Sequence, residues 1–131
     1  LRTKEIKMIF PAHPRTQKIL KRENIKLNFE PINPVGYFDM IELLKHCSLV
    51  ITDSGGLQKE AFFFKKYCIT AREQTEWTEL VKNGFNFIAG IDGGKIFHLY
   101  KSIIGKKGSF NKNLYGEGDA GKKIVKELEK L

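Results

Sequence analysis

The chain has 131 residues and a formal net charge of +8, and 41% of its residues are hydrophobic and 29% charged. This composition is typical of a folded globular protein and excludes a disordered one. Apolar runs stay far below the roughly 20 residues of a membrane span. Residues 1–9 carry charges where an export signal would have an apolar core. We therefore expect a cytoplasmic protein with no membrane partner, and, because its first residue is leucine, part of a longer chain.

The positive charge is concentrated toward both ends of the sequence, and residues 32–100 are nearly neutral. Only four of the 23 basic residues are arginines. Proteins that read nucleic acids rely on arginine for bidentate contacts and interleave aromatic side chains with a basic stripe. The lysines here are typical of solvated helix faces, so we expect no nucleic-acid partner.

The hydrophobic pattern alternates between short apolar runs and segments with helical spacing. In chain order it predicts strand 6–10, helix 14–24, strand 25–29, helix 37–44, strand 48–52, helix 57–64, strand 67–70, helix 75–83, strand 85–91, helix 93–104 and helix 121–131. Strands that alternate with helices at this spacing indicate βαβ units. The sequence therefore predicts an α/β protein with a doubly wound, mostly parallel sheet of about five or six strands.

The run Asp53-Ser54-Gly55-Gly56 lies between a predicted buried strand and a helix. Glycines at such a junction let a ligand approach the backbone closely, and the free N–H groups of a helix start attract anions. A phosphate is the obvious guest, although Ser54 could simply cap the helix of a tight turn. A nucleophile elbow would need glycine where Thr52 stands, and the P-loop pattern does not occur in the sequence.

Two further polar residues follow other predicted strands. His13 comes after the first strand, and Arg72 comes after the strand at 67–70. Taken alone, His13 could be a structural histidine, and Arg72 could be part of a surface ion pair. Because the carboxyl ends of parallel strands meet at one edge, we expect His13, Ser54 and Arg72 to converge there on a diphosphate.

Glu60 lies one helical turn beyond Gly56. Its carboxylate could accept hydrogen bonds from a ribose diol, or it could be a solvated helix residue. Thr75 and Glu76 follow Arg72 on the same rim, where Thr75 has the alternative role of a helix cap. No pair of carboxylates suits general acid–base catalysis, so the pattern indicates a binding site without a reacting centre.

Histidine and cysteine spacing does not indicate a metal site. His13, Cys47 and Cys68 are far apart in the sequence and form none of the usual ligand motifs. The two cysteines fit reduced thiols better than a disulfide framework. We expect neither a metal nor another cofactor.

Together these motifs resemble the non-hydrolysing UDP-N-acetylglucosamine 2-epimerase family over roughly residues 8–128. The resemblance rests on His13-Pro14-Arg15, Gly36-Tyr37-Phe38, Thr52-Asp53-Ser54-Gly55-Gly56-Leu57-Gln58, Glu60-Ala61, Arg72, Thr75-Glu76 and Asn113-Leu114-Tyr115-Gly116-Glu117-Gly118. It implies a Rossmann-like fold that is one half of a glycosyltransferase-B-type, two-domain enzyme. Residues 1–131 would be its C-terminal UDP-binding domain, and the N-terminal domain would lie outside this chain.

The resemblance also implies roles for individual residues. Ser54, Gly55 and Gly56 would hold the diphosphate, Glu60 would bind the ribose, and His13 would lie by the phosphates as the one possible catalytic residue. The remaining contacts to the UDP-sugar would come from Val35, Tyr37, Met40, Arg72, Thr75 and Glu76. The implied enzyme is an isomerase, a possible homodimer, that serves cell-surface polysaccharide biosynthesis. It would interconvert UDP-GlcNAc and UDP-ManNAc by eliminating and re-adding UDP.

Some residues depart from the family pattern. Trp77 stands where the family has an arginine that contacts the ligand, a change similar to relatives that act on UDP-diacetamido-glucuronic acids. Lys59 replaces a glutamate on what we expect to be a solvated helix face. The proton-transfer groups of the family belong to its N-terminal domain, so we expect this chain alone to be inactive. The donor-binding half of a glycosyltransferase stays open as an alternative.

Overall fold

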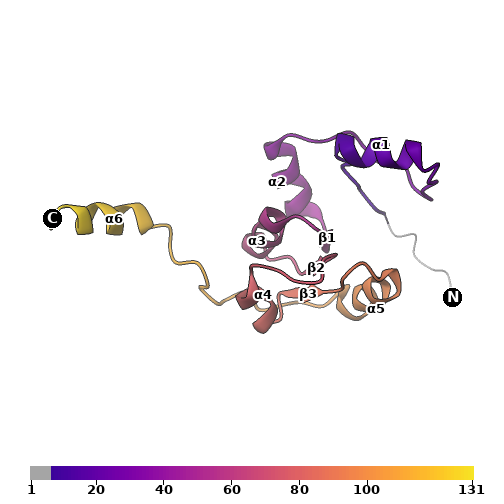
Figure 1. The fold of residues 1–131 in the computed structure, drawn as a ribbon. Helices are drawn as coiled ribbons and strands as arrows, with labels where there is room; N and C mark the ends of the chain where they lie inside the picture. The colour runs from indigo at the N-terminus through magenta and orange to yellow at the C-terminus, as the bar shows by residue number, and fades with distance from the viewer. Residues whose placement is uncertain (1–6) are drawn as a thin grey trace. The chain divides into compact units, whose positions relative to one another are not determined.

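A computed structural model describes residues 7–131 (Figure 1). The elements in chain order are α1 (Pro14–Arg22), α2 (Tyr37–His46), β1 (Val50–Thr52), α3 (Gly55–Phe63), β2 (Cys68–Thr70), α4 (Thr78–Lys82), β3 (Asn86–Ile88), α5 (Gly93–Ile103) and α6 (Ala120–Leu128). The chain forms two compact units, Leu1–Leu43 and Leu44–Leu131. None of the helices in the described residues combines the length and the apolarity needed to cross a bilayer.

The N-terminal unit contains α1 and one isolated parallel bridge between Pro11 and Ile32. The bridge is closed by the Ile32 N–H, which donates to Phe10 O, and by the Ala12 N–H, which donates to Ile32 O, both at 3.0 Å. The predicted strand at 25–29 is wrong, and the part of the predicted strand 6–10 that is described forms no strand; residue 6 lies outside the described residues. Prolines explain why no ladder grows beyond Ile32, since the next two bonds of this parallel register would need N–H groups at Pro34 and Pro14.

The second unit is built around a parallel sheet in the order β1-β2-β3. Thr52 pairs with Thr70, and Thr70 pairs with Ile88. The described residues thus form a sheet of three strands, fewer than the sequence pattern predicts. The parallel α/β architecture itself is confirmed.

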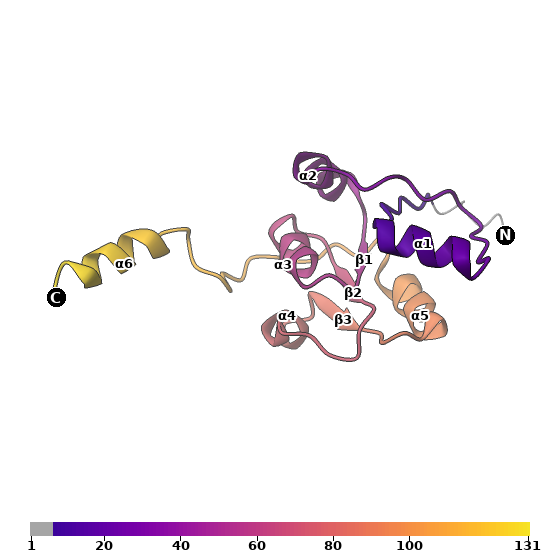
Figure 2. The same ribbon diagram turned by 45° about the horizontal axis from the view of Figure 1, so that its top comes forward.

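Helices cover both faces of this sheet (Figures 1 and 2). On one face, Cys68 of β2 packs with Val50 and with Ala61 of α3. On the other, Ile69 packs with Ala89 and with Ile103 of α5. Adjacent residues of a strand point to opposite faces, so β2 is buried from both sides, as a doubly wound sheet requires.

An aromatic cluster joins the segment after α5 to α3 and α4. Phe62, Leu80 and Phe85 form its buried centre. Phe110 stacks on Phe85 at 4.8 Å between ring centroids, and Tyr115 meets Phe62 edge-on at 5.7 Å. Residues 105–119 form no helix or strand, yet these ring contacts fix part of their path.

Of two further predicted helices, one is shorter than expected and the other is confirmed. The helix predicted at 75–83 is the shorter α4, whose N-cap is Trp77 rather than Thr75. The predicted last helix is confirmed as α6, which has no buried residue. Ile124 and Leu128 on its apolar face are each 60% exposed.

Candidate functional site

The ends of β1 and β2 bring Ser54 and Arg72 to the same edge of the sheet. Each follows a paired strand residue, Thr52 or Thr70, by two positions. The Ala71 N–H, donating to Thr52 O at 2.9 Å, continues the pairing just beyond the strands. A side chain at Gly55 would place its Cβ only 3.8 Å from Arg72 Nη1. The prediction that Ser54 and Arg72 converge on one edge is confirmed.

The first turn of α3 leaves two backbone donors free. Ser54 is the N-cap, and its hydroxyl accepts from the Leu57 N–H at 3.5 Å, while the Ser54 N–H donates to Thr52 Oγ1 at 3.0 Å. In the part of the chain that the structure describes, no acceptor faces the N–H groups of Gly55 and Gly56. Such donors, at the positive end of the helix dipole, are the kind of group to which an anion binds.

The start of α5 shows the contrast. There the Asp92 carboxylate caps the helix and accepts from the N–H groups of Gly94 at 2.8 Å and Lys95 at 3.1 Å. The chain therefore supplies its own anion to α5. At α3 the capping group is the neutral hydroxyl of Ser54. No carboxylate of the described chain caps this helix, so an anionic ligand could bind there.

Gly55 and Gly56 have different surroundings. Neither has a positive φ, so backbone conformation does not require glycine at either position. A methyl group at Gly55 would overlap the Glu76 carboxylate, whereas one at Gly56 would meet no atom within 4 Å. The open space next to Gly56 is where a ligand could reach the two free N–H groups.

Arg72 and Glu76 form an ion pair beside this turn. Arg72 Nη1 lies 3.1 Å from Glu76 Oε2, and the two side chains are 38% and 48% exposed. At that exposure the pair adds little to folding stability. Arg72 is therefore held at the mouth of the site and can turn toward an anionic ligand without disturbing the core.

Below the turn lies a buried hydrogen-bond network centred on Gln58. Its Nε2 donates to Ser54 O at 3.2 Å, and its Oε1 accepts from Thr75 Oγ1 at 2.5 Å and from Asn86 Nδ2 at 2.9 Å. Thr70 Oγ1 extends the network by donating to Asn86 Oδ1 at 2.6 Å. Gln58 is fully buried, and this network ties the start of α3 to β2, β3 and the loop between them.

The sequence analysis assigned no role to Gln58 or Asn86, and it gave Thr75 a contact to the UDP-sugar, with a helix cap as the alternative. The Thr75 hydroxyl instead donates to Gln58 and accepts from the Trp77 N–H at 3.2 Å. One signal could have found Gln58 and Asn86: both are polar residues at positions that the helix and strand periods place on the buried side.

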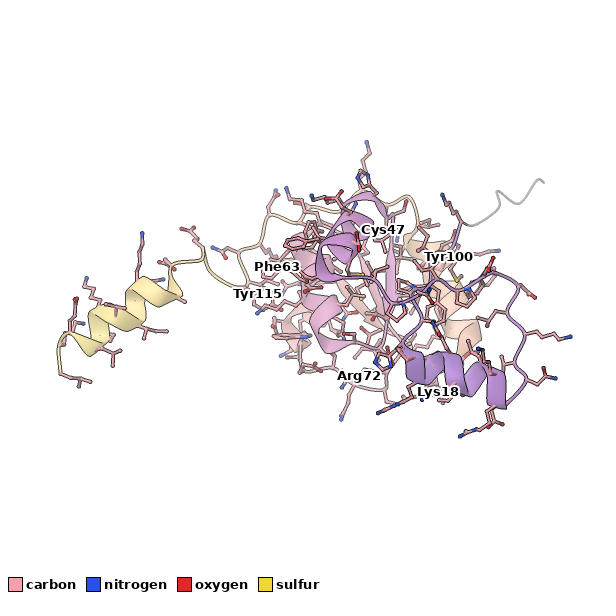
Figure 3. The ribbon with its side chains drawn as sticks, turned by 90° about the horizontal axis from the view of Figure 1, so that it is seen from above. Lys18, Cys47, Phe63, Arg72, Tyr100 and Tyr115 are labelled. Carbon is pink, nitrogen blue, oxygen red and sulfur yellow. The ribbon has the colours of Figure 1, made fainter. Side chains whose placement is uncertain are left out.

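Trp77 also contacts the first turn of α3. Its indole Nε1 donates to Gly55 O at 2.7 Å. The Lys59 ammonium lies 4.8 Å from the Trp77 ring and 4.3 Å from the Tyr115 ring, so the expectation of a solvated Lys59 is wrong. The Tyr115 ring also packs against Phe63, at 5.6 Å between centroids (Figure 3). Cation–π contacts thus hold Lys59 against an aromatic surface.

Tyr115 is tied to α4 by its hydroxyl, which donates to Glu79 Oε1 at 2.7 Å. Burial and this hydrogen bond raise the pKa of Tyr115. The same bond, above all, lowers the pKa of the Glu79 carboxyl. A carboxyl with a lowered pKa adds stability above its unfolded-state value, and this is lost as the pH falls through its folded-state value.

We therefore expect Tyr115→Phe to lower the free energy of unfolding at neutral pH, and the deficit to shrink as the pH falls below about 4.5, the ordinary carboxyl value. Urea denaturation across this range measures it. Tyr100→Phe is the control, since the Tyr100 hydroxyl has no hydrogen bond among the described residues, and its effect should not vary with pH. A deficit for Tyr115→Phe that stays constant into acid would contradict the assignment.

The other predicted site residues fall into two groups. Glu60 is half-buried on α3 and has no hydrogen bond or ion pair from its carboxylate within the described chain. In the N-terminal unit, His13 is exposed and caps α1, with Nδ1 accepting from the Arg15 N–H at 3.2 Å, which leaves Nε2 to donate outward. The assignment of His13 and of Val35, Tyr37 and Met40 to UDP stays a prediction.

Across residues 7–131, no three His, Cys, Asp or Glu side chains are grouped so that they could hold a metal ion. Both cysteines are free thiols. Burial raises the pKa of the Cys68 thiol to about 12, which makes it a poor nucleophile at neutral pH.

The fold and the candidate site together define an α/β domain with a doubly wound parallel sheet and with backbone donors without acceptors, among the described residues, at the carboxyl end of β1. A family model described as UDP-N-acetylglucosamine 2-epimerase matches residues 1–129. The chain belongs to the UDP-N-acetylglucosamine 2-epimerase family, which confirms the resemblance seen in its motifs.

Sequence similarity to individual proteins of known name gives the same family. The UDP-2,3-diacetamido-2,3-dideoxy-D-glucuronate 2-epimerase of Pseudomonas aeruginosa is 46% identical over 124 residues, which are 95% of this chain and 35% of that protein. The UDP-N-acetylglucosamine 2-epimerase of Methanocaldococcus jannaschii is 40% identical over 127 residues, 92% of this chain and 34% of that protein. The chain thus spans about a third of the length of these curated relatives.

A solved structure of the Methanocaldococcus jannaschii UDP-GlcNAc 2-epimerase, in complex with UDP-GlcNAc and UDP, is similar in fold. Its TM-score is 0.80 at 39% identity, over 94% of this chain and 35% of that one. The similarity supports the α/β fold described above.

Proposed function

We propose that the start of α3, from Ser54 to Gly56, binds the diphosphate of UDP. The observation that carries this proposal is that the N–H groups of Gly55 and Gly56 have no acceptor among the described residues, with open space at the Gly56 Cβ position and the Arg72 guanidinium close to Gly55. Backbone donors need no side-chain ordering to bind an anion, so the site is pre-organised. Family membership is independent support for UDP as the ligand.

We further propose that residues 1–131 are the C-terminal UDP-binding domain of a longer isomerase, a non-hydrolysing UDP-N-acetylglucosamine 2-epimerase. In the proposed reaction the sugar loses its C2 proton and UDP leaves C1. UDP then adds back after a proton returns to C2 on the other face. This chain would hold UDP through both steps, and residues elsewhere in the enzyme would move the proton. Coverage of about a third of each curated relative supports this division.

A second candidate is a 2-epimerase acting on UDP-diacetamido-glucuronic acid. The 46% identity to the Pseudomonas aeruginosa protein and the tryptophan at position 77 favour it. The kcat/KM values for the two UDP-sugars, measured side by side with the complete enzyme, would distinguish the two candidates. The true substrate should have the higher kcat/KM, while UDP itself would bind in either case.

Glu60 provides the test of the nucleotide. If its carboxylate binds the ribose hydroxyls, Glu60→Gln should weaken UDP by about tenfold, the worth of a charge-assisted hydrogen bond, and leave pyrophosphate affinity unchanged. Titration calorimetry on the 131-residue chain with both ligands measures this difference. Glu129→Gln makes the same charge change at the exposed end of α6 and should alter neither affinity. Equal losses for UDP and pyrophosphate would disprove the ribose contact, and no binding of either ligand to the unmodified chain would disprove the proposed function.

A further inference from the structure

The two free N–H groups of the anion site belong to consecutive peptide groups. Each peptide group is planar and trans, so the direction of its carbonyl determines the direction of the N–H at the other end. The Gly56 N–H therefore points opposite to Gly55 O. Any group that holds Gly55 O in place also aims the Gly56 N–H.

Trp77 is the side chain that holds this carbonyl. Its indole N–H donates to Gly55 O at 2.7 Å, across 22 residues of sequence. The preceding peptide group is held in the same way, because Gln58 Nε2 donates to Ser54 O at 3.2 Å. Both carbonyls at the start of α3 thus have a side-chain donor on the side away from the free N–H groups.

Glycine makes such a restraint necessary. Gly55 and Gly56 have more backbone freedom than any other residue pair could have, and the first turn of a helix is where helices fray. An anion that binds a loose turn must order it first, which lowers affinity. A hydrogen bond to Gly55 O removes part of this cost before the ligand arrives.

The indole is itself fixed from several directions. The backbone N–H of Trp77 donates to Thr75 Oγ1 at 3.2 Å, which joins the residue to the buried network around Gln58. Its ring meets the Tyr115 ring edge-on at 5.9 Å between centroids, and Lys59 Nζ lies 4.8 Å from it. These contacts give the indole N–H one direction, toward α3.

We propose that Trp77 is a positioning residue for the anion site, whose indole N–H orients the Gly56 N–H toward a phosphate. The proposal rests on the proposed function of the turn. It predicts that removal of this single hydrogen bond weakens phosphate binding while the fold persists.

The chain offers a precise test because Trp77 is its only tryptophan. In a tryptophan-auxotrophic host, β-(3-benzothienyl)alanine can replace it, with sulfur in place of the N–H and nearly the same shape. The matched control is 5-fluorotryptophan, which keeps the N–H. We expect the benzothienyl chain to bind pyrophosphate about fivefold more weakly than the control, the equivalent of one neutral hydrogen bond.

Two readouts separate positioning from a structural role. The Gly56 amide resonance should shift less on pyrophosphate addition in the benzothienyl chain than in the control. Urea denaturation should show that both chains are fully folded under the binding conditions. Equal pyrophosphate affinities in two folded chains would overturn the role of Trp77 alone. Failure of the unmodified chain to bind pyrophosphate would overturn the proposed function and, with it, this inference.

Discussion

Gly56→Ala is expected to separate ligand binding from folding. The added methyl group would stand in the open space through which a phosphate reaches the Gly55 and Gly56 N–H groups. Losing one charge-assisted hydrogen bond would weaken UDP and pyrophosphate binding by about tenfold to a hundredfold. Stability should be unchanged or higher by up to about 1 kcal/mol, because alanine is the better helix residue and no atom of the chain is displaced.

Gly121→Ala is the matched control for this experiment. Gly121 is also the second residue of a helix, α6, and a Cβ there would also meet no atom within 4 Å. It should show the same small change in stability and no change in affinity. Calorimetry and urea denaturation on the same samples measure both quantities. Unchanged pyrophosphate affinity in Gly56→Ala would rule out the turn as the phosphate site.

Gly55 is a less informative position, for a reason visible only in the structure. A side chain there would displace the Glu76 carboxylate and so break its ion pair with Arg72. Gly55→Val would therefore change the charge arrangement of the site as well as its accessibility. A loss of binding in that variant could not be attributed to a blocked approach alone.

Gln58→Met should cause the largest loss of stability. Methionine has a similar length but no donor or acceptor, so Thr75 Oγ1 and Asn86 Nδ2 would lose their acceptor in a buried place. Each buried polar group left without a partner costs about 1–3 kcal/mol, and we expect a total of about 3–5 kcal/mol. That is a large part of the 5–15 kcal/mol typical of a domain.

Urea denaturation at low temperature measures this effect, with Gln17→Met as the control. Gln17 is also a helical glutamine, but it is partly buried, and its side chain makes one hydrogen bond, from Nε2 to Ala12 O at 3.0 Å. Its replacement should cost about 1 kcal/mol. Equal costs for the two substitutions would show that the Gln58 network contributes nothing beyond one hydrogen bond.

Local sequence signals predicted much of the second unit correctly. The β-branched run before Asp53 became β1, and Ser54 became the N-cap of α3. Each depends on residues within a few positions of one another, where spacing in the sequence is also spacing in space. Parallel topology then placed Ser54 and Arg72 on one edge without any knowledge of side-chain contacts.

Strand pairing in the N-terminal unit could not be predicted in this way. The alternation of Ile25, Leu27 and Phe29 has the period of a strand, but a strand also needs a partner that can donate and accept along its length. Pro14 and Pro34 lack the N–H groups that the next bonds beyond Ile32 would need, and the described residues form a single bridge there. The periodicity of a sequence indicates which side chains share an apolar face. It does not indicate whether the backbone can form hydrogen bonds to a neighbouring strand.

By itself, the sequence determined the α/β class, the glycine turn at the end of β1 and the family resemblance, because these reside in short runs of adjacent residues. Only the tertiary structure decided how that turn is held. Gln58 meets Thr75 and Asn86 across 17 and 28 residues of sequence, and Trp77 meets Gly55 across 22. Such pairs form where the packing of α3 on β1 and β2 brings buried polar groups within reach of one another, and each group then needs a partner because it has left water.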